Sequence, residues 1–220
     1  QEHLISILEI AKRHHLPILA DEVYGKITFD SNKPFISCAD LCHEVPVVVI
    51  GTLSKRWLVP GWRVGWIILY DKLGVLGEFR LGLSQLKEAL GQPATFLVKA
   101  LPRILKEVPE SFYNETNLKL KLNAAHLYGL VSAIPGLSIN KPEGALFSIV
   151  MIDFSVLREI HNSIDFCSLI ATEQAVMLIP LEAFYGTAGF RVVLCSPPSV
   201  LDELARRLVD FMEAHRVHKC

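Results

Sequence analysis

The sequence predicts an α/β fold with a mostly parallel sheet and one antiparallel strand, followed by a smaller α+β domain. A helix and a short apolar strand precede the β-branched run Val47-Val48-Val49-Ile50, which is typical of parallel strands buried on both faces. The turn at Pro60-Gly61 leaves no room for a crossover helix, so the strand after it should run antiparallel. Beyond Pro135-Gly136, short strands are followed by flanking helices. We therefore expect two domains, residues 1–109 and 110–220.

In the first domain, apolar residues on a helical period predict a helix over residues 1–15. Residues 16–20 read as a short buried strand that ends before Asp21. Residues 26–46 contain turn residues and prolines, with a possible short helix at 36–41. The next strands are expected at 47–51 and 63–69.

Residues 73–133 are expected to be helical, with breaks at Gly91-Gln92-Pro93 and Val108-Pro109. In the longest segment, 110–133, one apolar face is formed by Leu120, Ala124, Leu127 and Val131. The remaining elements are expected as strands at 137–139, 145–152, 175–179 and 190–195 and as helices at 165–174 and 200–215.

Composition argues against several classes of protein. The chain has 220 residues, 51% of them hydrophobic, and a formal net charge of −1, so nothing favours nucleic acid or an anionic membrane surface as a partner. No apolar run approaches the roughly 20 residues that span a bilayer. Cys38, Cys42 and His43 lack a fourth ligand nearby, so we expect no metal site. The five unpatterned cysteines favour idle or buried thiols in a reducing compartment.

Polar side chains gather at the end of the 47–51 strand. Thr52, Ser54 and Arg63 supply two hydroxyls and a guanidinium, which together can hold a phosphate. Lys55 supplies an amine that can form a Schiff base with an aldehyde, although an isolated lysine at a strand end is usually just solvated. An aldehyde that carries a phosphate is pyridoxal 5'-phosphate. Arg63 taken alone is also compatible with an arginine that extends from a core strand into solvent.

Asp21 ends the first strand, and ligands of parallel sheets bind beyond such carboxyl ends. A carboxylate there would be costly without a partner, and a protonated pyridine nitrogen is such a partner. The alternative for Asp21 is to cap a following short helix. Tyr24 could direct its hydroxyl at the cofactor or simply pack. Arg191, at the head of the 190–195 strand, could bind a substrate carboxylate, although exposed arginines at strand starts are common.

These motifs resemble the fold-type-I pyridoxal-phosphate-dependent aminotransferases. The resemblance runs from residue 1 to about residue 215 and is closest to members that act on tyrosine. It is carried by Asp21-Glu22-Val23-Tyr24, by the run from Thr52 through Lys55 to Gly65, by Pro142-Glu143-Gly144-Ala145-Leu146-Phe147 and by Phe190-Arg191-Val192-Val193.

The resemblance implies a role for each candidate residue. Lys55 would be the Schiff-base lysine, with Asp21 at the pyridine nitrogen and Tyr24 near the phenolic oxygen of the cofactor. The phosphate would be bound by Thr52, Ser54 and Arg63, and the substrate carboxylate by Arg191. It also implies amino-acid and 2-oxo-acid substrates and a homodimer. The family usually has Ser in place of Thr52 and Pro-Gly in place of Leu181-Glu182.

The expected activity is transamination of an aromatic amino acid, L-tyrosine above all, to its 2-oxo acid with 2-oxoglutarate as amino acceptor. The glycine-rich phosphate loop and the aromatic that stacks on the cofactor in this family are not in these 220 residues. We therefore expect the chain to be the carboxy-terminal portion of an aminotransferase, in the cytoplasm or else in mitochondria. The alternatives are a catalytically incompetent fragment that acts as a structural or interaction module, and another reaction of the same cofactor, such as a carbon–sulfur lyase.

Overall fold

The computed structural model describes residues 1–42 and 44–217, so His43 and Cys220 lie outside the described residues. The chain divides into two compact units, residues 1–113 and 114–220, which we describe separately. The division falls in the first turns of helix α5 (Glu110–Ser132), the helix at which the sequence places the start of the second domain. No helix within the described residues has the length and apolar character needed to cross a membrane.

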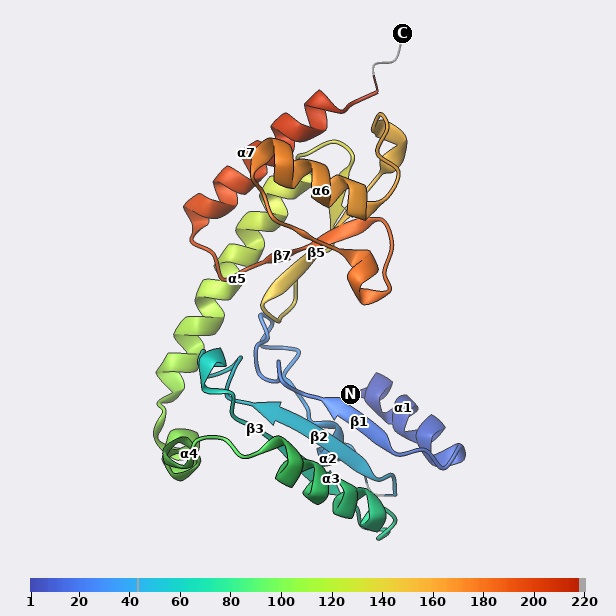
Figure 1. Ribbon diagram of the computed structural model, residues 1–220, viewed down its shortest axis with the longest axis vertical. Helices are drawn as coiled ribbons and strands as arrows, with labels where there is room; N and C mark the ends of the chain where they lie inside the picture. Colours follow the sequence, from blue (N-terminus) through green and yellow to red (C-terminus); the bar gives the residue numbers. More distant parts are fainter. Residues whose placement is uncertain (43, 218–220) are drawn as a thin grey trace. The chain divides into compact units, whose positions relative to one another are not determined.

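The first unit is built on a three-stranded sheet in the order β1-β2-β3 (Figure 1). Strands β1 (Ile18–Asp21) and β2 (Val47–Thr52) are parallel, and β3 (Gly65–Tyr70) pairs antiparallel to β2, as predicted. Strand β1 begins two residues later than expected, because the N–H of Leu16 is donated to Ala11 O of the preceding helix and Pro17 has no N–H to donate.

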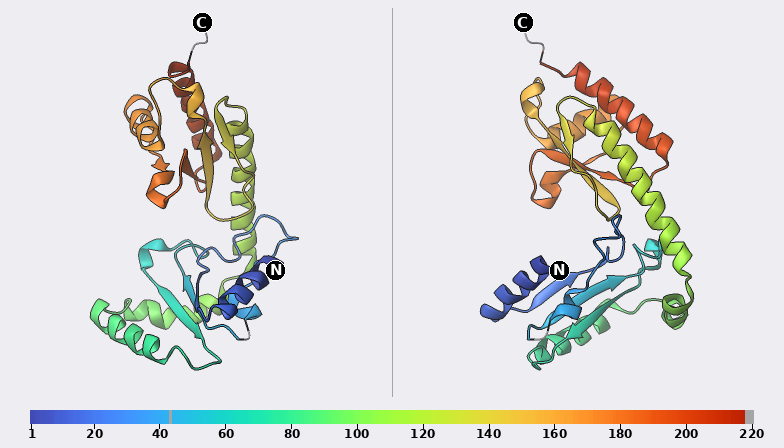
Figure 2. Two further views of the ribbon diagram at one scale, coloured as in Figure 1. Left: turned by 90° about the vertical axis from the view of Figure 1, so that its right-hand side faces the viewer. Right: turned by 180° about the vertical axis from the view of Figure 1, so that it is seen from behind.

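Helices lie on the first sheet and beside it. Helices α1 (Glu2–Arg13) and α2 (Cys38–Leu41) pack on the face of the sheet that carries Val47 and Val49. Helix α3 (Gly77–Leu90) runs alongside β3, and α4 (Thr95–Glu107) packs Leu97 against the loop between β2 and β3 (Figure 2). The breaks on either side of α4 lie at the predicted residues.

The second unit contains a four-stranded antiparallel sheet in the order β4-β5-β7-β6. Its strands are β4 (Leu137–Ile139), β5 (Phe147–Ile152), β6 (Ile179–Pro180) and β7 (Gly189–Val193), and its helices besides α5 are α6 (Ser163–Gln174) and α7 (Pro198–Ala214). The four apolar residues of α5 expected to share a face are all buried. Short 3-10 turns η1 (Pro60–Trp62), η2 (Phe154–Val156) and η3 (Leu181–Phe184) complete the two units.

The strand predicted at 175–179 is wrong in extent, since β6 covers only Ile179–Pro180. Ala175 adopts φ 51° and ends α6 in the left-handed conformation, and pairing with β7 starts only at Ile179. The core of this unit is centred on Phe166, Phe190 and Phe211, which are fully buried, and the ring of Phe166 contacts the rings of the other two.

Candidate active site

The candidate site lies where β2 ends and the loop to β3 begins. Strand β2 is central in the sheet, and the register pairs Thr52 with Gly65. Leu53 is fully buried and its N–H donates to the carbonyl of Val64, so the loop is fixed at its first residue. Thr52, Ser54, Lys55 and Arg63 are therefore all held within one connection between two paired strands.

The hydroxyls of Thr52 and Ser54 lie 3.0 Å apart. Thr52 Oγ1 also accepts a hydrogen bond from Ser54 N at 3.1 Å and lies 3.0 Å from the carbonyl oxygen of Val64. This local network orients the two hydroxyls together at the end of β2. These two hydroxyls are the members of the predicted phosphate-binding set that lie at the end of β2.

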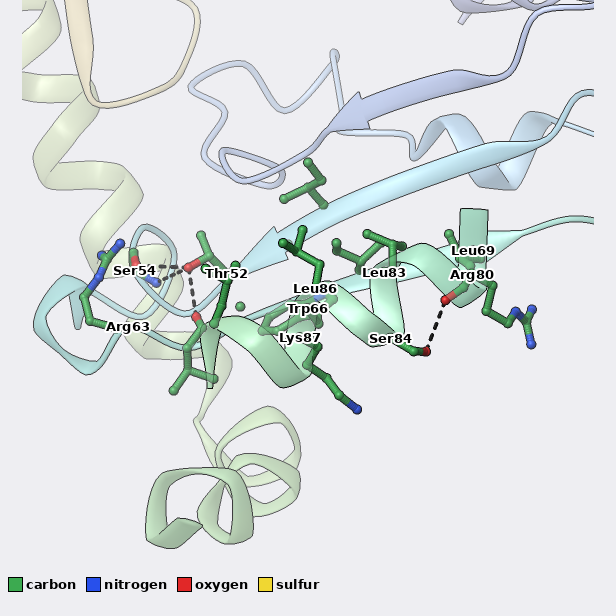
Figure 3. Close-up of a pocket in the computed structure, with 16 residues that line it drawn as sticks. Thr52, Ser54, Arg63, Trp66, Leu69, Arg80, Leu83, Ser84, Leu86 and Lys87 are labelled. Carbon is green, nitrogen blue, oxygen red and sulfur yellow. Dashed lines mark hydrogen bonds between the residues drawn. The ribbon is translucent and has the colours of Figure 1, made fainter. Parts of the chain in front are cut away.

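Arg63 stands at the other end of the loop, as the residue after η1, and adopts the left-handed conformation with φ 54°. Its side chain is exposed, and Nη1 donates to the carbonyl of Pro60 at 3.0 Å. Thr52, Ser54 and Arg63 line the same end of a cavity of about 640 Å³ between β3 and α3 (Figure 3). The structure thus brings together the three predicted phosphate ligands.

That cavity is otherwise lined mainly by apolar residues, and it has two further cations that the sequence patterns did not single out. Arg80 and Lys87 both belong to α3, and their side chains extend away from the Thr52 end of the cavity (Figure 3). Their spacing on an exposed helix carries no signal that would separate them from ordinary surface charges. We assign them no role in the site.

Lys55 lies beside Tyr24, which comes from the turn after β1. Lys55 Nζ is 5.4 Å from the centroid of the Tyr24 ring, and both side chains are half-buried. The amine therefore faces the segment that follows the neighbouring parallel strand. The structure brings this predicted pair together across more than thirty residues of sequence.

Asp21 is the last residue of β1 and pairs in register with Ile50 of β2. Its carboxylate accepts a hydrogen bond from Val23 N at 3.3 Å, so it caps a turn and no helix follows it. The side chain is exposed in the first unit. The free-energy cost of an unpartnered carboxylate, which the sequence suggested, therefore does not arise there. Asp21 stands at the carboxyl end of a strand adjacent to the one that leads to Lys55.

An aromatic cluster beneath the loop was not predicted. Trp57 contacts Trp66 and Tyr113 edge-to-face, each with ring centroids 6.0 Å apart. The guanidinium carbon of Arg56 lies 4.0 Å from the centroid of the Tyr113 ring. These contacts hold the loop that carries Lys55 against the start of α5, and no short-range pattern joins residues this far apart in sequence.

Gly51 is also required by the structure, although it carries no chemistry. A Cβ atom at this position would lie 2.3 Å from the indole nitrogen of Trp66, its partner in the register. The close approach of Trp66 to the β2 backbone is therefore possible only because residue 51 is glycine.

Arg191 belongs to the second unit, on β7. Its guanidinium carbon lies 4.6 Å from the centroid of Phe147 and 4.6 Å from the centroid of Phe184, so it is held between two aromatic rings. Arg191 Nε is buried and has no hydrogen-bond acceptor among the described residues. A flat, charged group with an unused donor suits a carboxylate ligand.

The donor set fits the cofactor that the sequence suggests. Hydroxyl and guanidinium groups can donate to a phosphate, and Thr52, Ser54 and Arg63 provide them at one end of a cavity. An aldehyde requires an amine, which Lys55 provides on the same loop. Cys38 and Cys42 are buried, and no group of three or more potential metal ligands is found within the described part of the chain.

The hydrogen bonds of Thr52 lead to a stability prediction. Thr52→Val leaves Ser54 N without its acceptor in a half-buried position, so we expect a loss of about 1–2 kcal/mol in the free energy of unfolding of the first unit. Urea unfolding followed by tryptophan fluorescence measures it, because Trp57, Trp62 and Trp66 all lie in this unit. Thr52→Ser keeps the hydroxyl and is the matched control. Equal stability of the two variants would contradict the role given to the network.

Comparisons with known proteins identify the family of this chain. The family described as aminotransferase class I and II matches residues 1–208. The chain is 40% identical to tyrosine aminotransferase of Mus musculus and 39% identical to that of Homo sapiens, each over 216 residues. Each match covers 98% of this chain and 47% of the relative, so the chain spans about half the length of the curated relatives it matches.

Solved structures show the same fold. The crystal structure of tyrosine aminotransferase from Leishmania infantum matches with a TM-score of 0.93 and 26% identity, over 99% of this chain and 53% of that one. Alanine aminotransferase from Pyrococcus furiosus matches with a TM-score of 0.87 and 29% identity, over 98% and 54%. The architecture is therefore that of the fold-type-I aminotransferases, which use pyridoxal 5'-phosphate. This chain belongs to the class I and II aminotransferase family.

Proposed function

We propose that this protein is a pyridoxal 5'-phosphate-dependent aminotransferase that transfers the amino group of an aromatic amino acid, L-tyrosine, to 2-oxoglutarate. The observation that carries the proposal is the loop after β2, which presents Lys55 beside Tyr24 and places Thr52, Ser54 and Arg63 at one end of a cavity. The choice of tyrosine is supported by the relatives at about 40% identity, which are named tyrosine aminotransferases.

Each candidate residue then has a role in holding the cofactor. The hydroxyls of Thr52 and Ser54 donate to the phosphate, and the Arg63 guanidinium neutralises its charge. Arg63 is exposed and can reach a phosphate, and the Thr52 hydroxyl, which lies 3.0 Å from Ser54 Oγ and from the Val64 carbonyl oxygen, would turn its proton to the phosphate. Asp21 pairs with the ring nitrogen, and the Tyr24 hydroxyl donates to the phenolic oxygen.

When bound, pyridoxal 5'-phosphate supplies an aldehyde for the amino group and a ring that accepts electrons from the substrate. Lys55 would hold the cofactor through its amine, and the same Nζ would be the base that moves the proton at the substrate Cα. Asp21 keeps the ring nitrogen protonated by its negative charge.

Arg191 binds the α-carboxylate of both substrates in this proposal. Its guanidinium carbon lies 4.6 Å from the ring centroids of Phe147 and Phe184, and its Nε has no acceptor among the described residues, which supports a bidentate contact with a carboxylate. An amino acid and a 2-oxo acid both carry a carboxylate next to the reacting carbon. One arginine can therefore serve both halves of the reaction.

The experiment is a transamination assay on the purified chain supplied with pyridoxal 5'-phosphate, L-tyrosine and 2-oxoglutarate. We expect equal amounts of glutamate and of the 2-oxo acid of tyrosine. Without 2-oxoglutarate, the reaction should form no more than one 2-oxo acid per protein chain. A carbon–sulfur lyase would release its products from a sulfur amino acid without consuming 2-oxoglutarate. Tight cofactor binding without any tyrosine-dependent glutamate formation would contradict the proposal.

The proposed assembly is a homodimer, as is typical of aminotransferases. Exposed apolar side chains on α1 and β1, among them Ile10 and Leu19 at 54% and 66% exposure, support burial of this region against another surface. Light scattering coupled to size-exclusion chromatography would show a mass of one chain if this part of the proposal is wrong.

The proposed compartment is the cytoplasm. Cys38, Cys42 and Cys167 are buried thiols with no disulfide, which suits a reducing environment. Burial, and then the charge of Glu182, raise the pKa of the Cys167 thiol to about 11, so it stays protonated. Fractionation of cells that express the tagged protein would detect a different location.

A further inference from the structure

Glu182 lies in η3 of the second unit, in the Leu181-Glu182 pair where the family usually has Pro-Gly. Its Oε1 accepts a hydrogen bond from Ser163 N, the first residue of α6, at 3.1 Å. Burial acts to raise the pKa of the Glu182 carboxyl, but hydrogen bonds from its own N–H and from the N–H and hydroxyl of Ser163 outweigh burial and lower it. The carboxylate is therefore charged at neutral pH and fixed at the start of a helix, where negative charge is favoured.

Ser163 extends this link to β7. Its side chain is fully buried, and its hydroxyl accepts a hydrogen bond from Gly189 N at 2.7 Å. Gly189 begins β7, and a Cβ there would lie 2.4 Å from the carbonyl oxygen of Val150 on β5. The start of β7 is therefore held between β5 and the pair formed by Ser163 and Glu182.

The hydrogen bonds that Ser163 makes with Gly189 and with Glu182 connect two segments that lie next to Arg191. Gly189 precedes Arg191 by two residues on β7, and Phe184, at the end of η3, stacks on the Arg191 guanidinium. Phe184 is 48% exposed, so little packing from other residues holds the ring in place. Besides the buried side chain of Leu181, η3 is attached to α6 by the hydrogen bond between Glu182 and Ser163.

We propose that Glu182 is a positioning residue for Arg191: its carboxylate ties η3 and the start of β7 to α6 and so keeps Phe184 stacked on the guanidinium. The inference rests on the proposed function in that it treats Arg191 as the carboxylate-binding group. Loss of the charge at residue 182 weakens this hydrogen bond and so loosens η3. Phe184 then separates from Arg191 more often, and the guanidinium becomes more accessible.

The test uses phenylglyoxal, which modifies accessible arginines, on the full chain with peptide mass spectrometry as the readout. Arg191 lines a cavity of about 510 Å³, so a small reagent can reach it, and exposed Arg103 is the internal reference. Glu182→Gln should increase the modification rate of Arg191 several-fold relative to Arg103. Glu213→Gln, a matched loss of charge on an exposed face of α7, should leave the ratio unchanged.

Ser163→Ala is a second variant that can be used if Glu182→Gln fails to fold. It removes only the hydroxyl that accepts from Gly189 N, and it should also increase the modification rate of Arg191 relative to Arg103, by less than Glu182→Gln does. In the transamination assay, Glu182→Gln should raise KM for 2-oxoglutarate several-fold with kcat nearly unchanged, a split that general destabilisation would not give. Unchanged Arg191 reactivity in both variants would overturn the inference.

The same reagent separates this inference from the proposed function. In the wild-type chain, 2-oxoglutarate should slow modification of Arg191 if that residue binds the substrate carboxylate. Absence of protection would contradict the role of Arg191 in the proposed function. An increased rate in Glu182→Gln would still support the positioning of Arg191 by Glu182, because that readout needs neither cofactor nor substrate.

Discussion

Replacing Lys55 with alanine is expected to lower kcat/KM for transamination by a factor on the order of 10³ or more. The substitution removes the group that holds the cofactor aldehyde covalently and the base that moves the proton at the substrate Cα, and a positioned general base alone contributes about 10²–10⁴-fold. Lys55 Nζ lies over the Tyr24 ring and makes no ion pair with any residue that the structure describes, so the fold should tolerate its loss. The rate of glutamate formation from tyrosine and 2-oxoglutarate measures the effect.

Two controls sharpen this result. Lys55→Arg keeps the positive charge but cannot form the covalent bond, so it should be as inactive as Lys55→Ala. Lys106→Ala removes an exposed lysine of α4 and should leave the rate unchanged. If Lys55→Arg retained most of the activity, the charge and not the amine chemistry would be what the loop provides.

Phe166→Ala is expected to lower the free energy of unfolding of the second unit by about 3–5 kcal/mol. Phe166 is fully buried, stacks on Phe190 with centroids 5.5 Å apart and meets Phe211 edge-to-face at 5.0 Å. Removal of its ring leaves a cavity under β7, the strand that carries Arg191. Since a whole domain is stable by only about 5–15 kcal/mol, the loss should be easily detected.

Guanidinium unfolding followed by two signals measures this loss. Far-UV circular dichroism reports both units, and tryptophan fluorescence reports only the first, which contains all three tryptophans. Phe166→Ala should move the circular-dichroism transition to a lower denaturant concentration and shift the fluorescence transition less. Phe166→Leu keeps most of the side-chain volume, so its loss in the free energy of unfolding should be clearly smaller. An unchanged circular-dichroism transition in Phe166→Ala would show that these rings do not form the core of the unit.

The part of the fold that the sequence predicts well is the part fixed by local patterns. The β-branched run at the start of β2 and the turn at Pro60-Gly61 determine two neighbouring strands and their opposite direction. That register alone places Thr52 opposite Gly65 and so brings the Arg63 end of the loop back to the strand end. The grouping of Thr52, Ser54 and Arg63 was predictable because it depends on one hairpin.

Other features depend on contacts between distant residues. The extent of β6 was mispredicted because pairing with β7, and not the apolar run before it, decides which residues form the strand. The stacking of Arg56 on Tyr113 and the bond between Glu182 and Ser163 join segments whose separation in sequence carries no periodic signal. Asp21 was expected to be costly without a charged partner, but its side chain is exposed in the first unit.

The central claim is that Lys55 is the amine that bonds to the cofactor. The direct measurement is borohydride reduction of the purified chain with pyridoxal 5'-phosphate, followed by proteolysis and mass spectrometry of the lysine-containing peptides. The account predicts one stable phosphopyridoxyl group, on Lys55, with Thr52, Ser54 and Arg63 as its neighbours in the site. A label on another lysine, or catalytic turnover with no label on Lys55, would contradict it.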